Sequence, residues 1–310
     1  MKKLTIILLA LVWAGTVAAQ DKTYFPATKG AELTYKYYNA RGKALKDEYK
    51  KERWMKFTVE EVWPEQDGMV INVAIGNETL DRLAADEGFK ATVDNLSYGD
   101  VKIADGMVTT DNMQWIVSSI PEFFSYIKGE DMKYRLELAA LSSFPQEMAV
   151  GDTLPGENIM EAKWYEMLTE EEKQEREESM KEFRMEFQAM GGHFYGSGAD
   201  FSSDRPIFTV TATTRNRKAE AVETVVTPAG TFECYKITYE VVRPDNGGFG
   251  SISVVFHGDM MMGGPHMRQQ EDPSDKYADW VSPEVGLVKR EKYNQRGKVT
   301  ERMILETYKK

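Results

Sequence analysis

One short stretch of the sequence combines side chains that bind soft metal ions. Residues 257–267 read HGDMMMGGPHM, which places histidines and methionines within one glycine-rich segment. Imidazole and thioether groups are ligands that suit Cu(I). We therefore expect weak Cu(I) binding by His257, Met260, Met262, His266 and Met267. The alternative is a loop whose methionines cover apolar surface or contact a partner protein.

The rest of the chain gives little indication of catalysis. His193, His257 and His266 form no recognisable catalytic arrangement, and Gly196-Ser197-Gly198 is too short to be a nucleophile elbow. Cys234 lies in an alternating strand pattern, which is more typical of a small buried hydrophobic residue than of a nucleophile. No glycine-rich phosphate loop follows a strand pattern. We therefore expect a protein that is not an enzyme and that requires no cofactor.

The composition excludes several classes of partner. The chain has 310 residues with 39 Lys+Arg, 50 Asp+Glu and a formal net charge of −11. This acidity argues against nucleic-acid binding, which depends on basic residues that displace counterions from phosphates. It also argues against attachment to anionic lipid. A single Cys excludes an intramolecular disulfide and any cysteine-clustered metal site.

The beginning of the sequence resembles a signal peptide. Lys2 and Lys3 precede an apolar run from Leu4 to Val17, and Val17-Ala18-Ala19 offers small residues for a signal peptidase. The apolar run is shorter than the roughly 20 residues that span a bilayer. We expect a signal peptide over residues 1–19 and a single exported domain over 20–310, periplasmic or secreted, with no membrane span after cleavage. The alternative is a retained N-terminal anchor.

The elements that would position any site are mainly strands. Apolar and aromatic residues recur at every second position in many segments, which predicts half-buried β-strands. The clearest runs are Leu33, Tyr35, Tyr37; Met55, Phe57, Val59; Met69, Ile71, Val73, Ile75; Phe208, Val210, Ala212; Tyr235, Ile237, Tyr239, Val241; and Ile252, Val254, Phe256. Turn sequences at 66–68, 104–106, 228–230 and 245–248 separate strands, so we expect antiparallel pairing. The fold class is mainly β, an antiparallel curved sheet or half-barrel.

Two segments depart from this alternation and predict helical insertions. Asp111 is in a position to cap a helix that carries Trp115 and Phe123, with Pro121 as a kink. An acidic insertion at about 157–200 contains the capping-box spacing Thr169–Glu172. Its apolar residues on one helical face are Met180, Phe183, Phe187 and Met190. The acidic helix either packs this stripe on the sheet or serves as a movable lid or partner-binding helix.

A six-residue pattern occurs twice. Residues 38–43 read YNARGK and residues 293–298 read YNQRGK. Asn before a Gly-containing turn suits the positive φ of tight hairpins, so we expect two equivalent hairpins. Shared hairpin chemistry or chance explains the match, and the alternatives are a diverged duplication or two facing hairpins that close one curved sheet.

Several turn-centred motifs together resemble a known family. They are Tyr24–Gly30, Phe144-Pro145, Met148–Pro155, Val226–Lys236, Tyr277–Val281 and Val285–Lys289. This series resembles the DUF3108-like (TapB-like) family of exported bacterial proteins, a domain family of unknown function. The resemblance implies an antiparallel curved sheet, similar to the half-barrels of periplasmic lipoprotein carriers, and implies no catalytic residues.

These observations favour a non-catalytic envelope protein. Curved sheets often hold apolar ligands on their concave face, and the chain is rich in aromatic residues. For an apolar small molecule or lipid, our candidate contacts are Trp115, Phe123, Met55 and Phe57. The alternatives are copper binding by the Met/His segment, a structural module for an envelope protein partner and, third, a hydrolase.

Overall fold

The fold is known from a computed structural model, which describes residues 22–47, 50–66, 68–85, 97–111, 134–154, 158–166, 169–189, 208–242 and 274–310. The strands are β1 Glu32–Asn39, β2 Trp54–Glu65, β3 Gly68–Asn77, β4 Tyr98–Ala104, β5 Met107–Asp111, β6 Tyr134–Pro145, β7 Asn158–Glu166, β8 Phe208–Thr227, β9 Gly230–Val242, β10 Ser274–Ser282, β11 Gly286–Tyr293 and β12 Val299–Lys309. The helices are α2 Glu78–Ala84 and α5 Glu170–Ala189. Among the described residues, no helix has the length and apolar character needed to cross a membrane.

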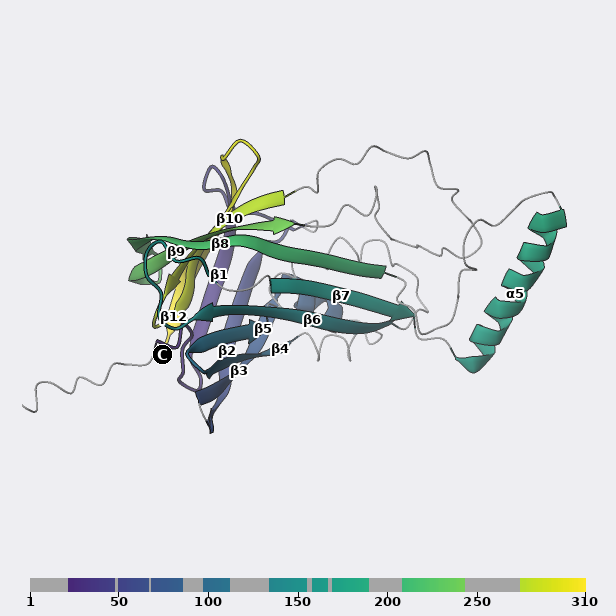
Figure 1. The fold of residues 1–310 in the computed structure, drawn as a ribbon, viewed down its shortest axis with the longest axis horizontal. Helices are drawn as coiled ribbons and strands as arrows, with labels where there is room; N and C mark the ends of the chain where they lie inside the picture. Colours follow the sequence, from purple (N-terminus) through teal and green to yellow (C-terminus); the bar gives the residue numbers. More distant parts are fainter. Residues whose placement is uncertain are drawn as a thin grey trace, which may run out of the picture.

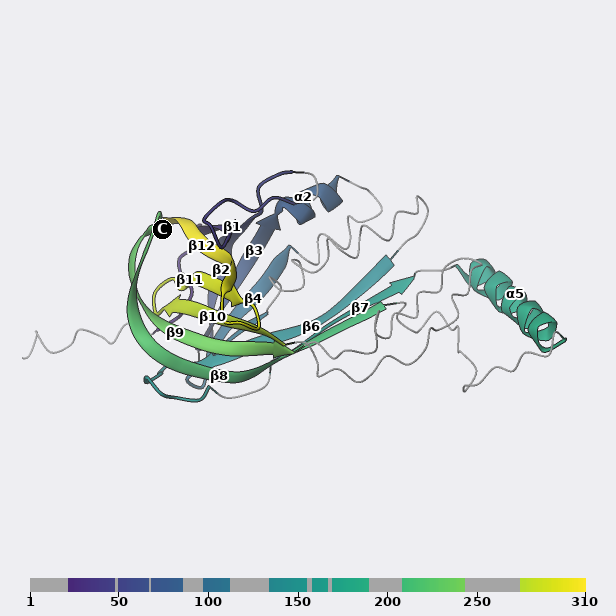
Figure 2. The same ribbon diagram turned by 90° about the horizontal axis from the view of Figure 1, so that it is seen from above.

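All of these strands belong to one antiparallel sheet. Each strand pairs with its neighbours along the chain, and β1 pairs with both β2 and β12. The predicted antiparallel curved sheet is therefore confirmed, and the pairing of β1 with β12 additionally closes it on itself (Figures 1 and 2). The predicted turn chemistry also holds where it is described. Asp105 and Gly106, with φ of 52° and 71°, join β4 to β5.

The repeated six-residue pattern forms two equivalent hairpins. Asn39 Oδ1 accepts hydrogen bonds from the backbone N–H groups two and four residues later, at 2.9 and 3.1 Å. Asn294 Oδ1 does the same at 3.0 and 3.0 Å. The following glycines, Gly42 and Gly297, have φ of 75° and 69°. Because β12 follows the second hairpin and pairs with β1, the two hairpins lie side by side at one end of the sheet.

The two ends of the sheet differ. At the turn end, defined by the strand ends Glu65, Ala104, Thr227 and Ser282, the connections are short. The segment before β1 covers this end: Tyr24 is 2% exposed, and its N–H donates to Pro283 O at 2.8 Å. Gly286 has φ of 82°, and a Cβ there would lie 2.3 Å from Tyr24 O, so only glycine fits. The opposite end, where β3, β5, β7 and β9 end, is the loop end.

Inward-facing side chains fill the sheet near the turn end. Tyr35 and Leu305 are 1% and 0% exposed, and Tyr35 packs edge-on against Phe57 with ring centroids 5.8 Å apart. The apolar positions of the alternating strands thus form the main core, as the sequence pattern predicted.

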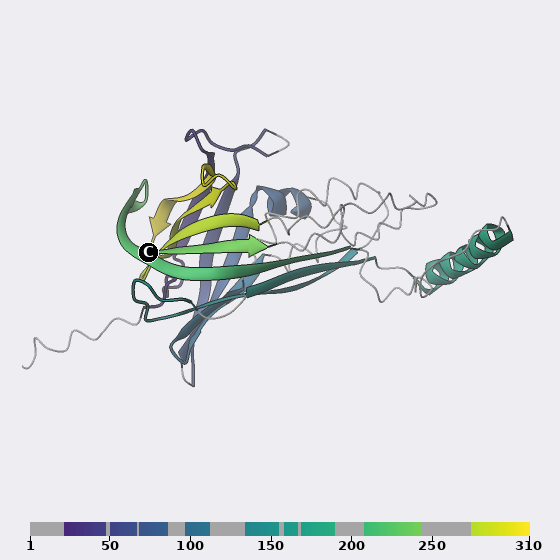
Figure 3. The same ribbon diagram turned by 45° about the horizontal axis from the view of Figure 1, so that its top comes forward.

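A second, smaller core lies on the outer face of β10 and β11. The β8–β9 hairpin is longer than β10 and curls back over this face, where β8 contacts β11 and β12 (Figure 3). Side chains alternate between the two cores along β10. Ala278 and Trp280 face the second core, whereas Tyr277, Asp279 and Val281 face the main core. The side chains of the second core are Val225, Cys234, Ala278, Trp280 and Val288. Cys234 is 1% exposed, which confirms it as a small buried hydrophobic residue.

The structure changes or leaves open several of the helical predictions. Asp111 is the last residue of β5, opposite Leu141, because Val108, Thr109 and Thr110 continue the strand. Residues 112–133, with Trp115 and Phe123, lie outside the described residues. The acidic insertion is also narrower than predicted, since 158–166 form β7. Helix α2 was not predicted, although Asn77 Oδ1 caps it by accepting the Leu80 N–H at 2.8 Å.

The acidic helix α5 begins where its capping box predicted. Glu172 accepts from the Thr169 N–H at 2.6 Å, and Thr169 Oγ1 accepts from the Glu172 N–H at 3.2 Å. The prediction that its stripe packs on the sheet is not met, because α5 stands apart from the sheet in Figures 1 and 2. Met185, which is not part of the predicted stripe, is 63% exposed.

Candidate functional site

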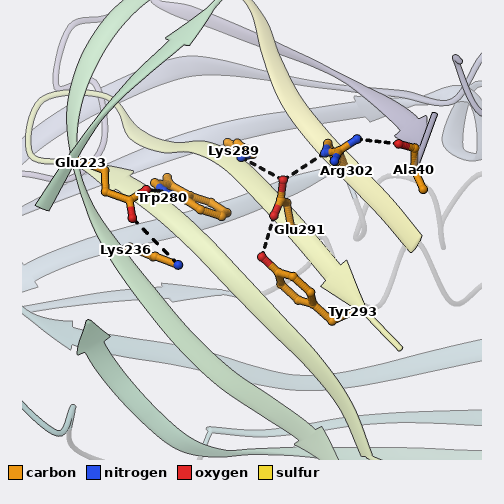
Figure 4. Close-up of polar contacts among 8 residues, drawn as sticks. All are labelled: Ala40, Glu223, Lys236, Trp280, Lys289, Glu291, Tyr293 and Arg302. Carbon is orange, nitrogen blue, oxygen red and sulfur yellow. Dashed lines mark hydrogen bonds and ion pairs between the residues drawn. The ribbon is translucent and has the colours of Figure 1, made fainter. Parts of the chain in front are cut away.

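Two polar clusters lie on opposite faces of the same strands. The inner cluster consists of Arg217, Tyr239, Tyr277, Asp279 and Arg290, which face the main core. The outer cluster is formed between the β8–β9 hairpin and the strands that it covers (Figure 4). Glu223 and Lys236 come from the hairpin, and Trp280, Lys289, Glu291, Tyr293 and Arg302 come from β10, β11 and β12. Arg290 and Glu291 are consecutive on β11, so the alternation of the strand separates the two clusters.

An arginine–aspartate pair organises the inner cluster. Arg290 Nε and Nη2 donate to the two oxygens of Asp279, each at 2.7 Å, in bidentate geometry. The Tyr239 hydroxyl donates to the same carboxylate at 3.2 Å, and the Tyr239 ring stacks on Tyr277 with centroids 5.4 Å apart. These contacts hold four side chains from β9, β10 and β11 in one arrangement on the inner face.

A bulge in β8 adds a second arginine to the inner cluster. Pairing between β8 and β9 is interrupted between Arg215 and Lys218, and Asn216 adopts φ of 55°. Bulges re-aim side chains, and Asn tolerates the left-handed conformation. Arg217 is consequently 7% exposed, and its Nη1 donates to Ser143 O at 2.5 Å.

The charges of the inner cluster influence one another. Burial lowers the pKa of Arg217, and the negative charge of Asp279 and the Tyr239 hydroxyl oppose this shift. Burial also disfavours the Arg290 cation, yet Asp279 and Tyr239 outweigh burial and keep its pKa above the ordinary value. Burial raises the pKa of Tyr239, so its hydroxyl is protonated at neutral pH and acts as a donor.

The inner cluster retains exposure although it faces inward. The Arg290 side chain is 23% exposed and that of Asp279 is 13% exposed, whereas Tyr35 and Leu305 of the main core are at most 1% exposed. The inner face therefore changes from a packed apolar region near the turn end to an accessible, aromatic and charged region farther along. Such a surface can bind a small molecule through ring stacking and hydrogen bonds.

The outer cluster is saturated with contacts. Glu291 accepts from Tyr293 Oη at 2.6 Å, Lys289 Nζ at 2.9 Å and Arg302 Nε at 3.0 Å. Burial raises the pKa of Glu291, but these three partners outweigh burial and hold it below its ordinary value. Arg302 Nη1 also donates to Ala40 O at 3.0 Å, which connects the cluster to the first of the two repeated hairpins (Figure 4).

Trp280 joins the outer cluster to the covering hairpin. Its Nε1–H donates to Glu223 at 2.7 Å, and Lys289 Nζ lies 3.9 Å from its ring centroid. Lys236 also approaches the ring, at 5.5 Å. Trp280 is only 4% exposed, so these contacts fasten the hairpin over β10 and β11 and leave no room for a ligand.

The predicted site residues divide between the core and the residues that are not described. Met55 and Phe57 lie on the inner face of β2, 2% and 4% exposed, packed within the main core. Trp115, Phe123 and the predicted copper ligands His257, Met260, Met262, His266 and Met267 lie outside the described residues. Within the described ranges, no group of three or more His, Cys, Asp or Glu side chains could hold a metal ion.

The inner cluster was missed, although the sequence contains a signal for it. Tyr277, Asp279 and Val281 occupy alternate positions of one strand, so an aspartate falls on an otherwise apolar face. A charged residue on that face requires a partner of opposite charge, which Arg290 supplies. Arg217 gives no comparable signal, because the β8 bulge that turns it inward cannot be read from the spacing.

Comparisons with known proteins agree with the fold. The DUF3108-like family model matches residues 200–246, the region of the β8–β9 hairpin, which confirms the predicted resemblance. A candidate exported protein with a YmcC-like fold from Bacteroides fragilis is 15% identical, with a TM-score of 0.50, covering 92% of this chain and 98% of its own. A candidate lipoprotein from Parabacteroides distasonis has the same identity and coverage, with a TM-score of 0.51. No curated protein matched the sequence.

Proposed function

Starting from this fold and the DUF3108-like match, we propose that the chain is a non-catalytic, exported envelope protein that binds an apolar ligand within its curved sheet. The observation that supports this proposal is the inner cluster, whose side chains face inward and yet retain exposure. Its stacked Tyr239 and Tyr277 rings offer an apolar surface, and its polar groups can fix a ligand's orientation.

The ligand-binding proposal is consistent with the leader predicted over residues 1–19 and with the two structural neighbours, one described as a candidate exported protein and one as a candidate lipoprotein. At 15% identity the likeness extends to the fold only, so the location of this chain outside the cytoplasm is proposed together with its ligand. The predicted sites at Met55 and Phe57 would act as the packed floor of the site, since both belong to the main core.

Native mass spectrometry of the protein purified from a bacterial envelope tests the proposal. We expect a bound apolar molecule in the spectrum and a rise in Tm when lipids are added to protein stripped of ligand, because binding to the folded state stabilises it. An unliganded mass together with no thermal shift from any lipid would refute the proposal.

Substitution of the stacked pair locates the site. Tyr277→Ala removes a partly buried inner ring and should weaken lipid binding severalfold. Tyr98→Ala is the matched control, because Tyr98 is a tyrosine on β4 that is already 52% exposed. Equal losses of affinity in the two variants would place the ligand elsewhere.

Copper binding is the second candidate function, and its support is the composition of residues 257–267. Soft ligands of this kind suit Cu(I). Competition with a Cu(I) chelator tests it directly, and failure of the full-length mature protein to withdraw copper from the chelator would rule it out.

A further inference from the structure

Three turns with the same hydrogen bonds occur at the loop end of the sheet. Besides Asn39–Lys43 and Asn294–Lys298, the chain turns between Asp47 and Lys51 before it enters β2. In each turn the side-chain oxygen of the first residue accepts from the backbone N–H four residues later, at 3.1, 2.8 and 3.0 Å in chain order. The backbone N–H of the first residue donates to the carbonyl of the fifth, at 2.9, 2.8 and 2.9 Å. We call these three turns the tip hairpins.

The middle tip hairpin has a lysine where the other two have glycine. The fourth residue of each turn has a positive φ, which is 75° at Gly42, 66° at Lys50 and 69° at Gly297. Lysine carries a Cβ, which makes this conformation costly for it but not for glycine. The chain therefore holds a basic side chain at a position that favours glycine, and non-glycine residues in this conformation are concentrated at functional sites.

The tip hairpins carry a local excess of positive charge. Residues 40–53 and 293–302 together contain nine Lys or Arg and four Asp or Glu, a net charge of +5 in a chain whose net charge is −11. Both segments project beyond the sheet at the top of Figure 1. Seven of the basic side chains are exposed, and no carboxylate of the described residues forms an ion pair with any of them. They are Arg41, Lys43, Lys46, Lys50, Lys51, Arg296 and Lys298.

The tip hairpins present this charge without an apolar anchor. The large hydrophobic side chains that are exposed among the described residues all lie elsewhere, and they are Trp63, Tyr98, Val150, Met185, Val222 and Val226. A protein–protein interface is usually built around a buried apolar core. A polybasic surface instead binds an anionic bilayer through charge contacts that add up residue by residue and need no fixed geometry.

We propose that the tip hairpins form an electrostatic docking surface for an anionic lipid bilayer. The net charge of the whole chain, which argues against such attachment, does not describe this end of the sheet. At physiological salt, charges more than about 8 Å apart are largely screened in water, so the acidic residues elsewhere do not cancel the tip hairpins. The attachment is peripheral and reversible, and it is separate from the binding of an apolar ligand on the inner face.

Co-sedimentation of the full mature protein with vesicles tests the docking. The two probes are vesicles of phosphatidylcholine alone and of phosphatidylcholine mixed with phosphatidylglycerol. We expect stronger binding to the anionic vesicles, and loss of this preference when salt is raised from about 0.1 M to about 1 M, because the Debye length falls from about 10 Å to about 3 Å. Equal binding to both kinds of vesicle at low salt would overturn the proposal.

Substitution of Lys50 separates charge from folding. Lys50→Gly removes one charge and places glycine at a positive φ, so the variant should retain the Tm of the wild type. Its binding to the anionic vesicles should weaken about fivefold, the effect typical of one basic residue near a charged membrane surface. Unchanged binding in this variant would contradict a role for the strained lysine.

A double variant and its control assign the preference to the tip hairpins. Lys43→Gln combined with Lys298→Gln should weaken binding to anionic vesicles by more than about tenfold. Lys29→Gln combined with Lys102→Gln changes the net charge equally at exposed lysines before β1 and on β4, and it should bind as the wild type does. Equal losses in the two double variants would overturn the proposal.

An acidic protein surface is the alternative outcome of these experiments. Helix α5 contains eight Glu and four Lys or Arg, so it could serve as such a surface in a second copy of the chain. Self-association at low salt that Lys43→Gln with Lys298→Gln abolishes, without a preference for anionic vesicles, would overturn bilayer docking in favour of this contact. Neither result bears on the proposed apolar ligand, which native mass spectrometry tests separately.

Discussion

The inner and outer clusters are built from similar groups but differ in how far they are covered. Each has a carboxylate that binds an arginine side chain and a tyrosine hydroxyl, and they share strands β10 and β11. In the outer cluster, Glu291 meets three donors under a covering hairpin. In the inner cluster, Asp279 meets two donors on a face that stays accessible.

If the proposed ligand binds the inner face, one sheet separates a stabilising cluster from a binding cluster. Three partners around Glu291 satisfy a carboxylate that is 10% exposed, so this group stabilises the folded chain. The side chains of the Arg290–Asp279 pair remain partly exposed, so water that contacts them can be exchanged for a ligand. Similar chemistry therefore predicts a structural role on one face and recognition on the other.

The largest effect should come from Glu291→Gln. Loss of the charge leaves Lys289 and Arg302 without their shared carboxylate, and we expect the free energy of unfolding to fall by about 2–3 kcal/mol. Urea denaturation measures this change. Glu60→Gln, at an exposed position of β2, is the control and should change stability by less than about 0.5 kcal/mol.

Asp279→Asn should destabilise the chain less, by about 1–2 kcal/mol, because water can reach the Arg290 side chain that it leaves. A loss of stability larger than that of Glu291→Gln would mean that the inner pair is the structural one, and the comparison between the clusters would fail.

The sequence predicted the parts of this molecule that depend on local pattern. Alternation located the inward-facing residues of β1, β2, β3 and β9, and the two Asn-containing hairpins formed with matching hydrogen bonds. Closure of the sheet is harder to predict from the sequence, because the pairing of β1 with β12 joins strands near opposite ends of the chain. Spacing alone cannot specify such a contact.

The clusters were missed for a related reason. Alternation assigns side chains to a face but does not say which strands are neighbours, so it cannot bring Asp279, Arg290 and Tyr239 together. The outer cluster depends in addition on the curl of the β8–β9 hairpin, which two irregularities in its pairing permit. The position of Arg217 depends on the first of these irregularities.

Acid titration gives the smallest expected effect. The folded-state pKa of Glu291 lies below the ordinary value of 4.5, so its stabilising contribution is complete above pH 4.5 and is lost as the pH falls through the lower, folded-state pKa. The difference in unfolding free energy between the wild type and Glu291→Gln should therefore shrink as the pH falls below 4.5. Denaturation curves at successive pH values measure it.

Glu78 provides the opposite slope for comparison. Burial raises its pKa above 4.5, so its ionisation costs stability, and this cost disappears as the pH falls through the raised, folded-state pKa. The advantage of the wild type over Glu78→Gln should accordingly grow with acidification, in a pH range above that of Glu291. If the stability difference between wild type and variant changed with pH in the same direction for Glu291→Gln and Glu78→Gln, the three donors around Glu291 would not outweigh its burial. Glu291 would then not act as a stabilising carboxylate.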